Sequence, residues 1–246
     1  MSDSTFNVAV FGATSSIASE TMRAIAGEHT AHFRLFGRNA DRLGAVASDL
    51  DARGASSEIR EVDLLSSDVD WSAQLEGKNW DVIYIAHGSL PDQEVTLNDS
   101  KKLELEMAIN FVSPVQIASA CASVLERQKR GTLAIIGSVA GDRGRQSNFL
   151  YGAAKSGLET FADGLRHRLF HLPDVKVTFL KPGMTDTPMT AGMEKGALFS
   201  SAAKVGRDAW TAIKRGRSTA YLPGWWWMVM TIIRLVPAPV FYRTKL

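Results

Sequence analysis

Short apolar runs alternate with amphipathic stretches along the first 180 residues of the chain. Each run is only four to six residues long, and several end at glycine or proline. Runs of this length and punctuation predict buried β-strands. The six strands predicted in this way are Val8–Phe11, His32–Phe36, Glu58–Val62, Asp81–Ala86, Thr132–Ile136 and Val175–Leu180.

The stretches between these runs carry apolar residues at helical spacing. They predict helices at Ile17–Ala26, Arg42–Arg53, Leu103–Leu125 and Tyr151–Phe170, with Pro114 as a kink or break in the third. Strands that alternate with helices predict an α/β, Rossmann-type fold with a doubly wound, mostly parallel sheet. Ligands bind such sheets at the carboxyl ends of the strands, so candidate chemistry is sought just after each strand.

Composition narrows the function classes. The 246 residues include 28 basic and 26 acidic side chains, a net charge of +2 that does not favour nucleic-acid binding. The single cysteine, Cys121, rules out an internal disulfide and is predicted to be a small buried hydrophobe in a reducing compartment. The polar start Met1–Asn7 lacks the pattern of a signal segment, so a cytoplasmic location is expected. No metal site is predicted.

The first strand runs into a turn that could hold a dinucleotide. A glycine-rich turn lets the backbone approach a pyrophosphate, which the following helix N-terminus attracts. Only Gly12 is glycine here, and Ser16 and Ala18 stand where such turns usually have glycine. The alternative is an ordinary helix N-cap of serine and threonine. The predicted cofactor contacts in this turn are Gly12, Thr14, Ser15, Ser16 and Ile17.

The end of the second strand bears on the choice of nicotinamide cofactor. A carboxylate there would bind the ribose 2′-hydroxyl of NAD, and a basic residue suits the 2′-phosphate of NADP. Arg38 follows Gly37 with no acidic neighbour, so NADP(H) is favoured over NAD(H). The alternative for Arg38 is a solvated surface residue. Asp63 and Leu64 end the third strand near the expected adenine, although Asp63 could simply cap a turn.

A second group of residues suggests acid–base chemistry. Tyr151 and Lys155 are four residues apart, so they share one helix face. A nearby ammonium group lowers the pKa of a phenol, which could then exchange a proton with a substrate oxygen. Ser138 follows the fifth strand and could polarise a carbonyl. Asn110 lies in a predicted helix interior, which asparagine disfavours, and could hold a kink and a relay water.

Together these residues resemble the short-chain dehydrogenases/reductases over roughly Val8 to Arg215. Asn110, Ser138, Tyr151 and Lys155 match that family's catalytic tetrad in order. The resemblance adds cofactor contacts at Pro182, Gly183, Thr185 and Thr187, with Thr187 on the nicotinamide carboxamide. Ile85-Ala86-His87-Gly88 departs from the family's Asn-Asn-Ala-Gly, so the expected cofactor contacts at Ala86, His87 and Gly88 follow position rather than identity.

The resemblance implies a reaction and an assembly. Hydride passes between nicotinamide C4 and a carbonyl carbon while Tyr151 supplies the proton. Lys155 lowers the phenol pKa and binds the nicotinamide ribose, Ser138 polarises the carbonyl, and Asn110 positions a water. The resemblance also implies a homodimer or homotetramer.

The C-terminal segment is unusually apolar and basic. Residues 1–220 are predicted to form the catalytic domain, and residues 221–246 a tail. The apolar core Trp225–Ile233 is too short to span a bilayer, but adjacent tryptophans and basic residues favour the membrane interface. A peripheral contact through Trp225–Leu246 at the inner face of the membrane is therefore predicted. The alternatives are a buried helix, a dimer contact, or a cover over an apolar channel.

Three features narrow the resemblance to reductases of decaprenylphosphoryl keto-ribose: the turn after the first strand, the Ala86-His87-Gly88 segment and the tail. That group reduces a keto-sugar carried on a polyprenyl phosphate, which would explain a membrane-seeking tail. It implies NADH, whereas Arg38 favours NADPH. Two other hypotheses remain: a soluble carbonyl or alcohol oxidoreductase whose tail packs on its own body, and a non-catalytic NAD(P)-binding sensor.

Overall fold

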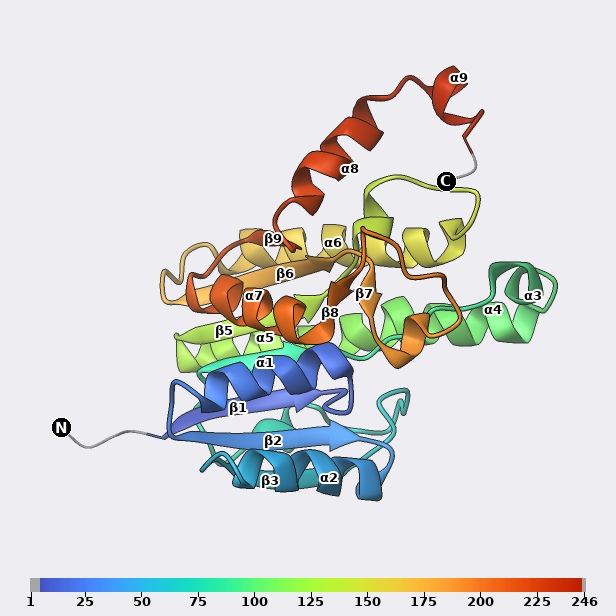
Figure 1. Cartoon of the computed structure of the whole chain (residues 1–246). Helices are drawn as coiled ribbons and strands as arrows, with labels where there is room; N and C mark the ends of the chain where they lie inside the picture. The colour runs from blue at the N-terminus through green and yellow to red at the C-terminus, as the bar shows by residue number, and fades with distance from the viewer. Residues whose placement is uncertain (1–4, 245–246) are drawn as a thin grey trace.

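The computed structural model describes residues 5–244 and contains one large parallel sheet. Its strand order is β3-β2-β1-β4-β5-β6-β9, with helices on both faces (Figure 1). This arrangement confirms the predicted Rossmann-type, doubly wound fold. The seven strands are β1 Phe6–Phe11, β2 Ala31–Gly37, β3 Ser56–Glu61, β4 Val82–Ile85, β5 Gly131–Ile136, β6 Val175–Pro182 and β9 Thr219–Leu222.

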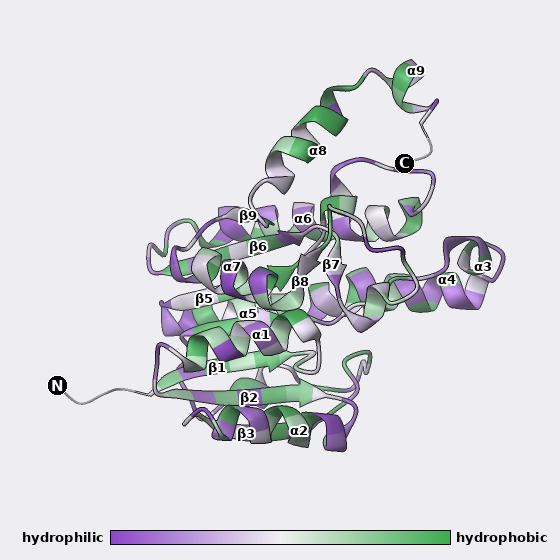
Figure 2. Ribbon diagram, in the orientation of Figure 1, coloured by the Kyte–Doolittle hydropathy of each residue, from purple (hydrophilic) through white to green (hydrophobic). Residues whose placement is uncertain are grey.

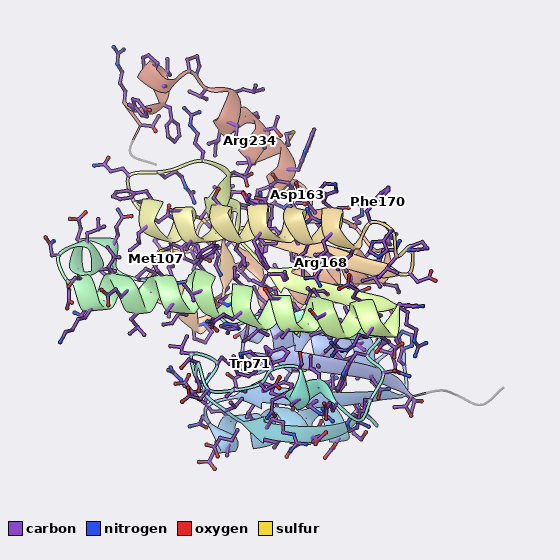
Figure 3. All side chains as sticks on the ribbon, turned by 180° about the vertical axis from the view of Figure 1, so that it is seen from behind. Trp71, Met107, Asp163, Arg168, Phe170 and Arg234 are labelled. Carbon is purple, nitrogen blue, oxygen red and sulfur yellow. The ribbon has the colours of Figure 1, made fainter. Side chains whose placement is uncertain are left out.

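Two hydrophobic cores lie on opposite faces of the sheet, because successive side chains of a strand point to opposite sides. Val8 and Val10 of β1 pack under the helices of one face, whereas Ala9 and Phe11 pack under those of the other. The first face carries α1 Ser16–Ala26, α2 Ala40–Asp51 and α7 Ala202–Lys214. The second carries α5 Ser113–Gln128 and α6 Phe149–Leu169, which lie side by side in Figure 3.

The strands β1 to β6 and β9 all end at the same edge of the sheet. The chain from β1 leads to β2 on one side, and the later strands continue from β4 on the other, so the order reverses beside β1. Such a reversal is where open α/β sheets bind their ligands. Short elements gather beyond this edge: α3 Gln93–Leu97, and the two-stranded sheet of β7 Thr185–Asp186 and β8 Ser200–Ser201.

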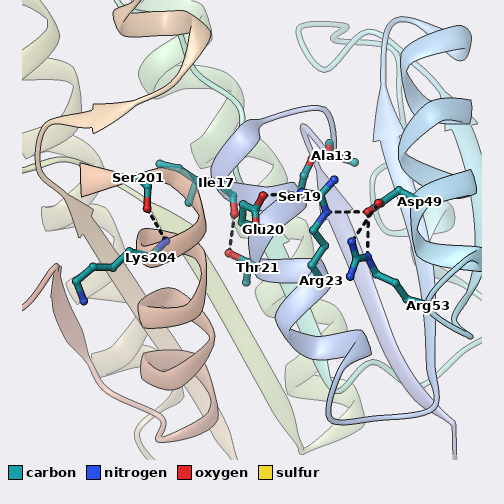
Figure 4. A network of polar contacts seen from close by, with 10 residues as sticks. All are labelled: Ala13, Ile17, Ser19, Glu20, Thr21, Arg23, Asp49, Arg53, Ser201 and Lys204. Atoms are coloured by element: carbon teal, nitrogen blue, oxygen red, sulfur yellow. Dashed lines mark hydrogen bonds and ion pairs between the residues drawn. The ribbon is translucent and has the colours of Figure 1, made fainter. Parts of the chain in front are cut away.

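The helix α1, which starts at the glycine turn, is held on both sides (Figure 4). Arg23 donates to the Asp49 carboxylate of α2 at 2.8 Å. On its other side α1 packs against α7, where the Ser201 hydroxyl caps the first turn by accepting the Lys204 N–H. The position of the α1 N-terminus is therefore set by its neighbours.

The long helix that contains Pro114, on the second face of the sheet, differs from its prediction. It runs without a break through Pro114. α4 Ser100–Met107 leads into a π-helical turn at Ala108–Val112, and this turn leads into α5. Of the predicted kink or break at Pro114, the structure has no break; the irregularity is the π-helical turn that lies one turn earlier. Proline has no N–H and its ring clashes with the carbonyl four residues before it, here that of Asn110, and a wider turn accommodates this.

The helical stretch Ser100–Gln128 is also long and apolar enough to cross a bilayer. Its inward face, however, is buried against the sheet through Ile117, Cys121 and Leu125. We therefore treat it as a core helix of the domain. Cys121 is fully buried as predicted, and burial raises the pKa of its thiol.

The last strand of the large sheet crosses the predicted C-terminal boundary. The predicted division after residue 220 falls inside β9, whose Tyr221 and Leu222 pair with Lys181 and Pro182 of β6. A four-residue strand that leads into the tail gave too little periodicity to detect. The tail proper follows as α8 Trp226–Leu235 and α9 Ala238–Phe241, which project from the body with a largely apolar surface (Figures 1 and 2). Lys245 and Leu246 lie outside the described residues.

Candidate active site

The turn after β1 allows the backbone of His87 to lie close to that of Gly12. Gly12 has φ +82°, and a Cβ at this position would lie 2.7 Å from the backbone nitrogen of His87. Only glycine fits both constraints. Ser15 precedes α1 without capping it through its side chain, so the first N–H groups of the helix stay available. Ser16 and Ile17 begin the helix, and Ala18 is fully buried, where its small side chain lets α1 pack closely on the sheet.

His87 stands between this turn and the long helix. Its Nε2 lies 2.9 Å from the Ser113 hydroxyl, which donates to the Leu64 carbonyl. The serine proton is thus committed, so His87 Nε2 carries the ring proton and Nδ1 is an acceptor. Burial, with Lys155 adding to it, lowers the pKa of His87 to about 3. A neutral His87 therefore connects the ends of β3 and β4, and Ala86 beside it donates its N–H to the Phe11 carbonyl.

Arg38 and Asp63, which were expected to contact the adenosine end of the cofactor, differ from each other in their surroundings. Arg38 is exposed directly after β2 and forms no ion pair within the part of the chain that the structure describes. Asp63 accepts the Leu65 N–H at 3.0 Å, which is the turn-capping alternative. One carboxylate oxygen of Asp63 is thus already used, whereas Arg38 keeps its charge uncompensated at the sheet edge.

The segment after β5 is pressed against α6, and two glycines make this contact. A Cβ on Gly141 would lie 2.9 Å from the Ser156 nitrogen, and a Cβ on Gly152 would lie 2.8 Å from the Ala140 oxygen. This approach brings Ser138 within hydrogen-bonding reach of Tyr151. The Ser138 hydroxyl also accepts the Ala140 N–H at 3.1 Å, which orients it. Sequence reasoning found Ser138 and Tyr151 but missed the glycines that join them.

Burial dominates the protonation of this pair. It raises the pKa of Tyr151 to about 12, against a lowering by the hydrogen bond with Ser138. It also lowers the pKa of Lys155 to about 8. The Lys155 ammonium lies 5.6 Å from the Tyr151 ring centroid, so the two share one helix face as predicted. The Tyr151 pKa is therefore raised overall, because desolvation outweighs the hydrogen bond with Ser138.

Asn110 is buried in the π-helical turn, and its side-chain amide is fully bonded. Its Oδ1 accepts the Ser89 N–H at 3.2 Å, and its Nδ2 donates to the Ser89 hydroxyl at 3.0 Å and to the Glu106 carboxylate at 3.2 Å. Asn110 Oδ1 and Lys155 Nζ both face Gly88, within 3.3 Å of where a Cβ would sit. The glycine after His87 thus keeps open the space between asparagine and lysine.

The segment after β6 lies at the same carboxyl edge of the sheet. Pro182 ends the strand and Gly183 donates its N–H to the Leu222 carbonyl at 2.9 Å. Thr185 is buried, and the Thr190 hydroxyl donates to its carbonyl and accepts the Thr187 N–H. These contacts fold the chain back over the sheet edge, so that Thr187 lies at the start of a short 3₁₀ turn.

Comparisons with known proteins identify the family to which this chain belongs. The family described as short chain dehydrogenase matches residues 7–197. The chain belongs to the short chain dehydrogenase family. It is accordingly an oxidoreductase that acts on CH–OH groups and the corresponding small-molecule carbonyls, and uses NAD(P).

Three proteins illustrate how this short chain dehydrogenase relates to others. An uncharacterized oxidoreductase of Mycobacterium tuberculosis is 31% identical over 241 residues, covering 96% of each chain. A short-chain dehydrogenase from Sphingobium yanoikuyae in complex with NADPH has a TM-score of 0.80 at 20% identity, covering 97% of this chain and 96% of that one. A bulky-bulky ketone specific alcohol dehydrogenase from Comamonas testosteroni has a TM-score of 0.79 at 17% identity, covering 97% and 94%. The two structures support the fold.

Behind the Pro182–Gly183 segment of this dehydrogenase lies a charged cluster that the sequence did not reveal. Lys181 is 2% exposed and forms ion pairs with Asp142, whose side chain is fully buried, and with Glu159 of α6. The Tyr221 hydroxyl of β9 donates to Asp142 at 2.8 Å. The cluster joins β6, β9, α6 and the turn after Ser138. Its only sequence signal is a lysine at the end of an apolar strand.

The tail contacts the same segments. Trp226 lies directly on Gly183, where a Cβ would be 1.8 Å from the indole nitrogen, and it packs with Val139 beside Ser138. Arg143 donates to the Val236 carbonyl at 2.7 Å, and its guanidinium carbon lies 3.8 Å from the centroid of the Phe241 ring. The tail is therefore attached to the loops that carry the candidate site, rather than to a distant part of the domain.

Proposed function

We propose that this dehydrogenase reduces a ketone, with Tyr151, Ser138, Lys155 and Asn110 as its catalytic residues. The observation that carries the proposal is the contact of the Ser138 turn with α6. It places a serine hydroxyl, a phenol and a buried lysine side by side at the carboxyl edge of the sheet. Asn110 approaches the same lysine across Gly88.

In this mechanism Tyr151 is the proton donor. A phenol with a pKa of about 12 keeps its proton at neutral pH, as reduction of a carbonyl requires. The Ser138 hydroxyl donates to the same carbonyl oxygen, where negative charge develops. Lys155, with a pKa of about 8, is mostly protonated at pH 7 and stabilises the phenolate left behind. The Lys155 ammonium then gives a proton to the phenolate, and a water oriented by Asn110 returns a proton to the neutral Lys155 amine.

The chain's own residues suit a nicotinamide dinucleotide. When bound, this cofactor supplies the hydride. Gly12 and the uncapped start of α1 would receive its pyrophosphate, and Thr14, Ser15, Ser16 and Ile17 would surround it. Other contacts would come from the remaining strand ends: Asp63, Leu64, Ala86, His87, Gly88, Pro182, Gly183, Thr185 and Thr187, with Lys155 on the nicotinamide ribose.

NADP(H) is the proposed cofactor because Arg38 is exposed at the end of β2 with an uncompensated charge. Arg38→Asp should weaken NADPH binding on the order of 10–100-fold, since a charge-assisted contact to the 2′-phosphate is lost and a repulsion is gained. NADH binding should change little. Titration of nicotinamide fluorescence with both cofactors measures this. Equal NADPH affinity in the variant would mean that Arg38 is only a surface residue, and Arg42→Asp provides a neighbouring control.

The proposed substrate is a hydrophobic ketone, specifically a keto-sugar carried on a polyprenyl phosphate. The tail supports this choice, because its apolar helices lie on the loops of the candidate site. The ketone-specific enzyme from Comamonas testosteroni shares the fold. We propose that the protein is cytoplasmic and peripheral to the inner membrane face, with a catalytic domain through β9 and a lipid-contacting tail after it. We also propose a homodimer or homotetramer formed through α4–α5 and α6.

The tail's membrane contact is tested on its exposed face. Trp227 and Ile232 are more than half exposed, so Trp227→Glu and Ile232→Glu should leave the fold intact. Each should reduce binding to anionic vesicles by on the order of tenfold, because an apolar side chain can no longer enter the interface. Vesicle sedimentation measures this, with Thr231→Glu as the matched helix control. Undiminished sedimentation of both variants would contradict membrane contact through α8.

The reaction itself is tested by NADPH oxidation with a panel of ketones, from small soluble ketones to lipid-linked ketoses. Turnover of the soluble ketones alone would favour the alternative, a carbonyl or alcohol oxidoreductase whose tail covers its own body. Cofactor binding without any turnover would favour the NAD(P)-binding sensor.

A further inference from the structure

Exposed large hydrophobic side chains are unevenly distributed on this molecule. Most of those in the described residues belong to the tail or to segments beyond the carboxyl ends of the strands. Outside the tail, Phe149 is the first residue of α6, and Met189, Met193 and Leu198 lie in the loop between β7 and β8. We call these four residues the apolar rim. α3 adds Val95 and Leu97 at the same edge.

The apolar rim borders the candidate site. Phe149 lies two residues before Tyr151, and Met189 two residues after Thr187. In Figure 1 the start of α6, the β7–β8 loop, α3 and α9 all lie at the end of the molecule toward which the strand arrows point. The site and the segments that carry the exposed apolar residues therefore lie at the same end of the molecule.

Among residues 5–244, the opposite end lacks such a field. Phe170, at 86% exposed, stands at the far end of α6, away from Met107 and the carboxyl edge (Figure 3). Its sequence neighbours Arg168 and His171 are polar, and Arg168 is paired with Glu126. An isolated exposed phenylalanine is ordinary on a protein surface, whereas a field of apolar side chains around a site indicates a contact.

The charge of the tail indicates what covers its part of this field. No aspartate or glutamate follows Asp208, whereas Arg234 and Arg243 lie within the tail. The exposed tail side chains include Trp225, Trp227 and Tyr242, which are residue types that favour the headgroup region of a bilayer. Basic residues beside aromatic and aliphatic ones complement an anionic lipid surface. A second copy of this chain would bring the same positive charges together.

We propose that the apolar rim and the tail form one membrane-facing surface, so that the candidate site opens onto the lipid. This inference rests on the proposed membrane contact and adds the orientation of the molecule. The reacting group of a lipid-linked ketone enters between the β7–β8 loop and α6 while its chain stays in the bilayer. The strand amino ends and Phe170 face the aqueous phase.

The orientation is tested by single cysteines carrying an environment-sensitive fluorophore. Cys121 is fully buried, so an introduced cysteine is the accessible labelling position in the described residues. Met193→Cys and Leu198→Cys should each show a blue shift and at least a twofold intensity gain with phosphatidylglycerol-containing vesicles. Phe170→Cys should show neither. Unchanged signals at both rim positions on vesicle-bound protein would overturn the orientation and leave the tail contact standing.

A second measurement uses charge in the apolar rim. The double variant Met193→Glu/Leu198→Glu should reduce turnover of a vesicle-embedded ketone at least tenfold relative to a soluble ketone, and Phe170→Glu should keep the original ratio. An unchanged ratio in the rim variant would overturn the proposal. Loss of a self-association that exists without vesicles would also overturn it, since the rim would then be a contact between copies. Failure of the unmodified protein to bind vesicles would instead refute the proposed membrane contact itself.

Discussion

Tyr151→Phe is expected to lower kcat for ketone reduction by about 10²–10⁴-fold, the range that one general acid contributes. The ring is retained, so the packing of α6 against the Ser138 turn and the position of Lys155 should persist. The dissociation constant for NADPH should therefore change little. Stopped-flow or steady-state NADPH oxidation measures the first quantity, and nicotinamide fluorescence the second.

The control for this substitution is Tyr242→Phe, which removes the hydroxyl of an exposed tyrosine in the tail. It should retain full turnover of a soluble ketone. Retention of kcat within a factor of three in Tyr151→Phe would refute the assignment of Tyr151 as proton donor. Loss of NADPH binding together with turnover would show instead that the phenol supports the cofactor site.

Lys181→Met is expected to destabilise the fold by about 3–5 kcal/mol, the cost of breaking a buried ion pair from one side. The methionine fills similar space but leaves the fully buried Asp142 side chain without its cation. For a chain of this length the loss corresponds to a fall in Tm of about 6–20 °C. Differential scanning calorimetry or urea unfolding measures it.

The double variant Lys181→Met/Asp142→Asn separates charge from packing. Removing both charges should recover part of the lost stability, because no unpaired carboxylate remains buried. Lys204→Met is a suitable control, since Lys204 forms an exposed pair with Asp208 and should change Tm by little. A Tm for Lys181→Met equal to that of the unmodified protein would refute the structural importance of the buried cluster.

Local patterns were sufficient for much of this fold. The six predicted strands and four predicted helices all exist, with ends that differ by a few residues, because each has its own apolar period and several end at glycine or proline. Two elements near the C-terminus were not predicted. β9 has only four residues, whereas α7 has a clear apolar face and packs on α1 by means of Gly206, where a Cβ would meet Glu20 at 2.4 Å.

The candidate site likewise has features that the sequence predicted and features that it did not. Asn110, Ser138, Tyr151 and Lys155 could be proposed from residue type, order and spacing. Ser138 follows a strand, Tyr151 and Lys155 share a helix face, and Asn110 is an asparagine in a helix interior. The pKa of Tyr151 could not, because it depends on burial by segments distant in sequence. The partners of Asn110 likewise became visible only when the π-helical turn placed Ser89 and Glu106 beside it.

The sequence by itself thus determined the family, the succession of strands and helices along the chain and the residue types available for chemistry, because these are recorded in short-range patterns. Only the tertiary structure decided which groups touch. It showed that Gly141 and Gly152 bring the Ser138 turn onto α6, and that Lys181 and Asp142 neutralise each other behind the site. It also placed Trp226 on Gly183. These contacts join segments far apart along the chain, so their geometry depends on packing that no local pattern encodes.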